Sequence, residues 1–129
     1  MSTPTETIEA FVAAFIAAWP GGDATELASF FSEDAVYHNG PMEPIRGREA
    51  IQASLSSFMA MGGEVGVDIG HLVADGAIVM TERVDHFIGT AETISLPVMG
   101  VFEVRDGAIT AWRDYFDLNQ FTSQMQDSA

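Results

Sequence analysis

The sequence predicts an α+β fold in which a strongly curved, mixed but mostly antiparallel sheet wraps over N-terminal helices. In the first half of the chain, apolar residues recur at the spacing that is typical of amphipathic helices. After Gly63 the chain is rich in β-branched and aromatic residues and contains two Asp-Gly pairs, which favour hairpin turns. Helices followed by an antiparallel meander are typical of the α+β class. With 129 residues, the chain is expected to form one domain over residues 1–129.

The first helix has both a start and a stop signal. Thr3 is expected to be its cap, with Pro4 at the first helical position and Glu6 reaching back to the cap. The Pro20-Gly21-Gly22 segment ends it. Its apolar positions are Ile8, Phe11, Val12, Phe15, Ile16 and Trp19.

Two further helices are expected before the main strands. Asp23 and Glu26 repeat the capping pattern, which predicts a short helix that ends at Phe30 or Phe31. The next helix is predicted over residues 49–61, and Gly62-Gly63 ends it. Its apolar side consists of Ile51, Leu55, Phe58 and Met59.

The predicted strands follow the turn signals. A short strand is expected at residues 35–38, before a turn that is rich in glycine and proline. Asp75-Gly76 and Asp106-Gly107 mark hairpin turns in the second half. The four longer strands are predicted at residues 65–74, 77–88, 94–104 and 108–118. A short helix after Leu118 is expected to close one end of the fold.

Composition restricts the possible partners. Five Arg and no Lys stand against 19 Asp and Glu, for a formal charge of −14, so neither nucleic acid nor an anionic membrane is an expected partner. The N-terminus lacks the pattern of a signal peptide and no apolar run is long enough to span a membrane, which predicts a cytoplasmic protein. Without cysteine, and with His38, His71 and His86 outside any ligand spacing, no metal and no cofactor are expected.

Alternation along the strands brings five polar residues to one side of the sheet. Side chains two positions apart on a strand share a face, so Arg83 and Asp85 point the same way. If the apolar neighbours of each strand face a cavity, the polar groups that converge there are Tyr37, Asn39, Arg83, Asp85 and Asp114. One arginine between two aspartates can keep one carboxyl protonated and the other ionised, as acid and base catalysis requires. The same pattern also fits a buried ion-pair network that only joins two strands.

Three segments carry a resemblance to a known family. Glu82-Arg83-Val84-Asp85, the strand Leu96-Pro97-Val98-Met99-Gly100-Val101-Phe102-Glu103 and the segment Ile109-Thr110-Ala111-Trp112-Arg113-Asp114-Tyr115-Phe116-Asp117 are similar to the limonene-1,2-epoxide hydrolase family. Tyr37-His38-Asn39 resembles the Tyr-x-Asn element of that family, which binds water. The resemblance implies a cystatin-like cone of the nuclear transport factor 2 type. It also implies an enzyme that opens an apolar epoxide with water, without a cofactor, to give a vicinal diol.

The resemblance also implies a role for each polar residue. Asp114 is the general base that acts on a water held by Tyr37 and Asn39, while protonated Asp85 donates to the epoxide oxygen and Arg83 bridges the two carboxyl groups. From the sequence pattern, the apolar residues expected to line the pocket are Leu55, Met59, Leu96, Val98, Phe116 and Phe121.

Two other functions fit the same fold. An isomerase or cyclase, such as a ketosteroid isomerase or polyketide cyclase, would move a carbon-bound proton with one aspartate. A non-catalytic binding or dimerisation module would have Arg83 and its aspartates sealed from ligands. Whatever the function, strand alternation also predicts an apolar patch on the convex sheet face, and a homodimer is its simplest consequence. The patch comprises Val84, His86, Ile88, Met99 and Val101.

Overall fold

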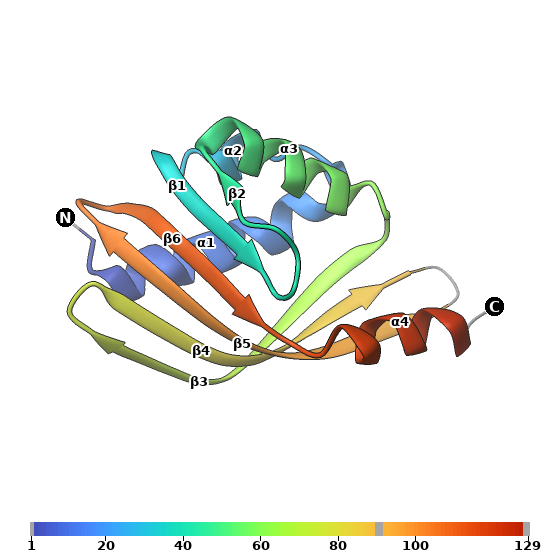
Figure 1. The fold of residues 1–129 in the computed structure, drawn as a ribbon. Helices are drawn as coiled ribbons and strands as arrows, with labels where there is room; N and C mark the ends of the chain where they lie inside the picture. Colours follow the sequence, from blue (N-terminus) through green and yellow to red (C-terminus); the bar gives the residue numbers. More distant parts are fainter. Residues whose placement is uncertain (1, 90–91, 128–129) are drawn as a thin grey trace.

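A curved six-stranded sheet that covers three helices forms the body of the protein (Figure 1). The computed structural model describes residues 2–89 and 92–127. The strand order is β2-β1-β6-β5-β4-β3, and the pairs are antiparallel except for the parallel pair β1–β6. This architecture confirms the predicted α+β class with a mixed, mostly antiparallel sheet.

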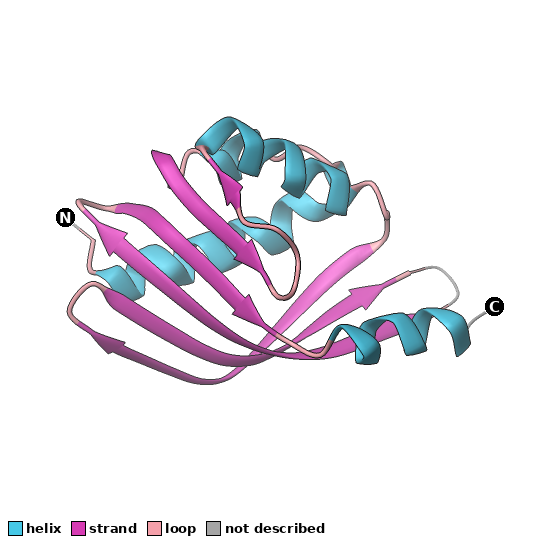
Figure 2. Ribbon diagram, in the orientation of Figure 1, coloured by secondary structure: helices cyan, strands magenta, loops and turns pink. Residues whose placement is uncertain are grey.

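The strands, in chain order, are β1 (Phe31–Asn39), β2 (Ile45–Arg46), β3 (Glu64–Asp75), β4 (Ile78–Ile88), β5 (Thr93–Arg105) and β6 (Ala108–Tyr115). The helices are α1 (Pro4–Ala18), the 3-10 helix η1 (Trp19–Gly21), α2 (Thr25–Ala28), α3 (Arg48–Met59) and α4 (Leu118–Asp127). Figure 2 shows α1, α2 and α3 on one side of the sheet and α4 at its far end, beside β5. No helix in the described ranges is both long and apolar enough to cross a membrane.

The first helix begins where the sequence predicts. The Thr3 hydroxyl accepts a hydrogen bond from the Glu6 N–H, and the Glu6 carboxylate accepts one from the Thr3 N–H, which completes a capping box. Ile8 and Phe11 of α1 and Trp19 of η1 are buried beneath the sheet, as their spacing predicts. Ile16, expected on the same side, is instead 37% exposed. Gly22 ends this region with a positive φ of 70°, a conformation that glycine adopts without steric cost.

The second helix and its neighbours differ from the prediction. Helix α2 stops at Ala28 rather than at Phe30 or Phe31, because Phe31 already begins β1 and is buried against α1. Asp23 does not cap this helix; its carboxylate accepts a hydrogen bond from the Thr25 N–H, and Ala24 occupies the cap position.

Strand boundaries also differ at three places. β1 extends over nine residues instead of the predicted 35–38 because its parallel partner β6 pairs with it as far back as Phe31. The two-residue strand β2 is too short to be recognised from the sequence. The last strand ends at Tyr115 rather than Leu118, since the Asp117 carboxylate accepts from the Asn119 N–H and α4 begins at Leu118. This helix is the predicted C-terminal one.

The core lies between α1 and the concave side of the sheet. The ring of Phe11 contacts Phe31, Phe102 and Trp112 edge to face, with centroid separations from 5.3 to 6.2 Å. This packing fixes the strand β6, on which Trp112 lies, against the helix layer. It leaves an unfilled space toward the end of the sheet where α4 lies, and the polar residues open into that space.

Candidate active site

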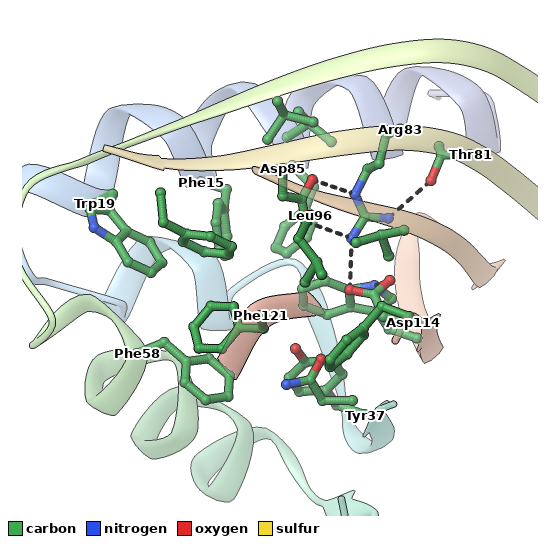
Figure 3. A pocket seen from close by; sticks show the side chains of 18 of the residues that line it. Phe15, Trp19, Tyr37, Phe58, Thr81, Arg83, Asp85, Leu96, Asp114 and Phe121 are labelled. Carbon is green, nitrogen blue, oxygen red and sulfur yellow. Dashed lines mark hydrogen bonds and ion pairs between the residues drawn. The ribbon is translucent and has the colours of Figure 1, made fainter. Parts of the chain in front are cut away.

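Arg83 joins the two aspartates that the sequence singled out. Its Nε lies 2.8 Å from Asp85 Oδ1, and its Nη2 lies 3.2 Å from Asp85 Oδ2 and 2.7 Å from Asp114 Oδ2 (Figure 3). Arg83 and Asp114 are 7% and 6% exposed, so this is an almost fully buried bridge. Burial opposes the charge of the guanidinium, but the two carboxylates outweigh it and raise the pKa of Arg83 above its usual value.

Thr81 completes the surroundings of the guanidinium. Its hydroxyl accepts a hydrogen bond from Arg83 Nη1 at 3.1 Å, and the residue is fully buried. Thr81, Arg83 and Asp85 alternate along β4 and therefore face the same side of the sheet. Thr81 was not among the predicted site residues, although its position two residues before Arg83 already placed it on that face.

Asp114 is held by two donors from different elements. The Trp112 Nε1–H donates to its Oδ1 at 2.8 Å, while Arg83 donates to its Oδ2. Burial raises the pKa of Asp114 above its ordinary value, and the nearby Arg83 guanidinium opposes that rise. An ionised carboxylate of raised pKa is a stronger proton acceptor than an ordinary one, and each of its oxygens keeps a further lone pair.

Tyr37 and Asn39 lie beside Asp114 on the neighbouring strand. In the parallel β1–β6 pair, Tyr37 is opposite Trp112 and Asn39 is opposite Asp114. Burial and the Asp114 charge raise the pKa of Tyr37 well above its usual value, so its hydroxyl stays protonated and can donate. Among the described residues, the Tyr37 hydroxyl and the Asn39 side-chain amide have no hydrogen-bond partner, and both residues line the cavity. Their polar groups therefore remain available to a bound molecule.

The cavity has one polar end and an extended apolar wall. Its volume is about 220 Å³. Figure 3 shows Arg83, Asp85 and Asp114 at one end, while Phe15, Trp19, Phe58 and Phe121 gather at the other. The polar side chains come from strands, whereas helices and η1 contribute most of the aromatic rings at the opposite end, where Phe87 of β4 joins them. Such a space suits an apolar molecule that presents one polar group to the carboxyl pair.

Four of the six predicted apolar residues line this cavity: Leu96, Val98, Phe116 and Phe121. Leu55 and Met59 do not line it. They are 1% and 2% exposed and lie in the hydrophobic core, on the side of α3 that packs toward β1. Phe58, one position from Met59, lines the cavity instead. Phe15, Trp19 and Phe87 also line it without having been predicted, because their spacing is equally typical of a plain core.

The histidines lie away from the polar end. On β4, His86 alternates with Arg83 and Asp85, so it points to the opposite side of the sheet. There its Nδ1 lies 2.7 Å from Ser95 Oγ and its Nε2 lies 2.9 Å from Asp68 Oδ2. His38 and His71 are not among the residues that line the cavity.

The chain matches one protein family over almost its whole length. The model of the limonene-1,2-epoxide hydrolase catalytic domain matches residues 2–127. Epoxide hydrolase EphG of Mycobacterium tuberculosis is 42% identical over 109 residues, a match that covers 83% of this chain and 71% of that protein.

Solved structures agree in fold. A limonene-epoxide-hydrolase-like epoxide hydrolase of M. tuberculosis superposes with a TM-score of 0.73 at 38% identity, covering 96% of this chain and 92% of that one. A hypothetical protein of Catenulispora acidiphila with a ketosteroid isomerase-like fold has a TM-score of 0.75 at 28% identity, covering 88% of this chain and 90% of that one. Both similarities span most of the chain.

Proposed function

Because the chain belongs to the limonene-1,2-epoxide hydrolase family and is an epoxide hydrolase, we propose that it adds water to an apolar epoxide in one step and releases a vicinal diol. The observation that carries this proposal is the Asp85–Arg83–Asp114 bridge at the wall of an otherwise apolar cavity. A buried bridge that only joined strands would not need to open onto a space that small molecules can occupy. Family membership also favours hydrolysis over the isomerase and cyclase reactions that occur on the same fold.

Asp114 is the general base in this proposal. Water lies between the Tyr37 hydroxyl, the Asn39 amide and Asp114, whose raised pKa favours proton transfer from water. As the water oxygen attacks an epoxide carbon, its proton passes to Asp114. Tyr37 and Asn39 fix the direction of attack, because both keep their hydrogen-bonding capacity for the ligand.

Asp85 is the general acid. The carbon–oxygen bond breaks as the Asp85 proton passes to the epoxide oxygen, so the product is a neutral diol. After the step Asp114 holds a proton and Asp85 is ionised; one proton must return from Asp114 to Asp85 before the next cycle. Arg83 contacts both carboxyl groups and thereby couples their charges, so that the pair holds one proton between them.

The apolar wall defines the substrate class. Phe15, Trp19, Phe58 and Phe121 offer ring faces and edges but no charge, so the bulk of the substrate is hydrocarbon. An epoxide fits this site because its single weak acceptor oxygen needs only one donor, which Asp85 supplies. Terpene-like and cyclic epoxides are the members of this class that a cavity of about 220 Å³ accommodates.

We also propose that the protein is a homodimer through the outer face of the sheet. Met80, Met99 and Ile88 are about 40% exposed on this face, and half-buried Val84 and Val101 lie between them. The neighbouring charges are paired, as in the contact between Arg113 and Glu103. A second copy suits such a face because a twofold axis brings the same apolar surface together from both subunits.

The test of the reaction is the origin of the oxygen that is added. Terpene, cycloalkene and styrene oxides are screened for diol formation, and the best substrate is then used with enzyme in excess in water enriched in heavy oxygen. A single turnover should place the label in the diol and none in the protein. A covalent route through an aspartyl ester would instead give an unlabelled first diol and a labelled peptide containing Asp85 or Asp114. If none of the epoxides yields a diol, the proposed substrate class is wrong.

A further inference from the structure

Gly100 lies at the one point on β5 that the bridge between Arg83 and Asp114 must cross. In the sheet, β5 separates β4 from β6. Gly100 pairs with Thr81 on β4 and with Asp114 on β6, so these three residues form a row across the three strands. The guanidinium of Arg83 reaches Asp114 by lying over this row.

A side chain at position 100 would occupy the space of the guanidinium. A Cβ atom on this residue would overlap Arg83 Nη1 and would lie 2.9 Å from both Asp114 Oδ1 and Thr81 Oγ1. All three atoms belong to the site, and none belongs to the backbone. The backbone itself does not require glycine, because Gly100 is absent from the residues with positive φ, unlike Gly76 and Gly107 in the hairpin turns.

From this geometry we infer that Gly100 is a positioning residue for the reaction: the absence of a side chain there allows Arg83 to bridge Asp85 and Asp114. The inference rests on the proposed function for its catalytic consequence. It differs from an ordinary packing role because the three atoms that a Cβ would crowd are all side-chain atoms of the site, and the nearest is the end of the long Arg83 side chain. The sheet can accept a methyl group only by displacing the guanidinium together with the Asp114 and Thr81 oxygens that it contacts, so the bridge is lost before the fold is.

Gly100→Ala is the primary test, with Gly66→Ala as the matched control. Gly66 also lies inside a strand, β3, but its added Cβ would meet only side-chain carbons of His86 and Ile88 at 3.8 Å or more, which is ordinary contact. We expect Gly100→Ala to lower kcat/KM by about 100-fold or more, the range for loss of one positioned proton transfer. Gly66→Ala should remain within about twofold of the wild type. A Gly100→Ala enzyme with near wild-type kcat/KM would overturn the inference.

A double-mutant cycle with Arg83→Lys separates positioning from general damage. Lysine lacks the forked guanidinium and hence the atom nearest to a Cβ at position 100, and its absence leaves space for Asp114 and Thr81 to shift. If Gly100 acts through Arg83, the Gly100→Ala/Arg83→Lys enzyme should be no less active than the worse of the two single variants. Effects that multiply would show that the two residues act independently. Should Gly100→Ala fail to fold, the double variant should fold; if it also fails, Gly100 serves strand packing and the inference is wrong.

The indole N–H of Trp112 gives a readout that does not depend on activity. This group donates to Asp114, whereas the indole N–H of Trp19, the other tryptophan in the chain, donates to the Gly62 carbonyl. In a pH titration followed by ¹H–¹⁵N NMR, the Trp112 signal should report ionisation of Asp114 and the Trp19 signal should serve as internal reference. Arg83 holds the pKa of Asp114 down, so displacing it should move the Trp112 midpoint upward by about one pH unit or more.

The two readouts distinguish a wrong function from a wrong role for Gly100. A shifted Trp112 midpoint in Gly100→Ala, in a protein whose wild type hydrolyses no epoxide, would support the positioning role and refute only the proposed reaction. An unshifted midpoint would refute the positioning role, whatever the wild type catalyses.

Discussion

The ring of Tyr37 stacks on the indole of Trp112, with centroids 4.1 Å apart and an angle of 13° between the planes. The same indole donates its N–H to Asp114 and also stacks on the ring of Phe102. One side chain therefore holds both the proposed base and the tyrosine that is proposed to orient the water. This relationship predicts that Trp112 affects the reaction without touching the substrate's reacting atoms.

Trp112→Phe should retain the stacking on Tyr37 and lose the hydrogen bond to Asp114. Because that hydrogen bond lowers the pKa of Asp114, its loss should raise the pKa. The base must be ionised to act, so activity is lost as the pH falls through this pKa. The acidic limb of the kcat/KM profile should therefore move to higher pH in the variant. Trp19→Phe removes an indole that does not contact Asp114, so it should leave the position of that limb unchanged, whatever its effect on KM.

Asp114→Asn and Asp85→Asn should each lower kcat/KM by about 10²–10⁴-fold, because each removes one proton-transfer group while keeping the side-chain shape. Far-UV circular dichroism should show that both variants remain folded. The control is Asp117→Asn, since Asp117 is exposed and an amide oxygen can still accept from the Asn119 N–H. If either site variant retains more than about half of the wild-type kcat/KM, its proposed role is wrong.

Strong chelators should leave the activity unchanged, because in the proposed step Asp85 donates a proton and Asp114 accepts one, without a Lewis acid. In the ranges 2–89 and 92–127, no three His, Asp or Glu side chains are placed so that they could hold a metal ion. The measurement is diol formation after dialysis against chelator, with and without added divalent metal. Loss of activity that a metal restores would contradict the proposed chemistry.

Met99→Glu should convert the proposed dimer to monomer by placing a charge on the outer sheet face. Light-scattering mass at micromolar concentration is the measurement. Ile16→Glu is the matched control and should leave the mass unchanged. Ile16 is similarly exposed, but it lies on α1, which covers the other face of the sheet. A wild-type protein that is monomeric under these conditions would refute the dimer.

Phe121→Ala should shift the substrate range toward larger epoxides. Phe121 lies on α4, lines the cavity and contacts Phe87 edge to face at 5.7 Å. Its removal enlarges the apolar end and leaves the carboxyl pair untouched. The ratio of kcat/KM for a bulky epoxide to that for a small one should rise about tenfold. An unchanged ratio would show that Phe121 does not limit substrate size.

The polar end of the site could be predicted from sequence because strand alternation is strict along β4 and β6. Arg83 and Asp85 are two residues apart on one strand, and Asp114 lies on the inner face of another; both assignments survive a shift in strand ends. The register between neighbouring strands, by contrast, cannot be read from alternation within one strand. The alignment of Thr81, Gly100 and Asp114 depends on register across β5, which local alternation does not determine, so alternation alone did not place Gly100 in the site.

The helical walls were harder to predict for a related reason. Residues at helical spacing form one apolar side, and part of that side meets the core while part meets the cavity. On α3 the prediction placed Leu55 and Met59 in the pocket, but the core receives them and Phe58 faces the cavity. Periodicity gives the side of the helix that turns inward; the orientation of the helix over the sheet decides which positions meet empty space.

The separation of polar strands from aromatic helices has a consequence for engineering. Tyr37, Asn39, Thr81, Arg83, Asp85 and Asp114 all lie on β1, β4 and β6, whereas Phe15, Phe58 and Phe121 lie on three different helices. Libraries that vary only the helical positions should therefore explore new epoxides, and new faces of attack, while the proton-transfer groups keep their geometry. The helical positions should be varied together, because Phe15 and Phe121 are linked by ring contacts through Trp19 and Phe87, and residues with shared contacts do not contribute additively. In evolutionary terms, substrate range can diversify in this scaffold faster than its chemistry can change.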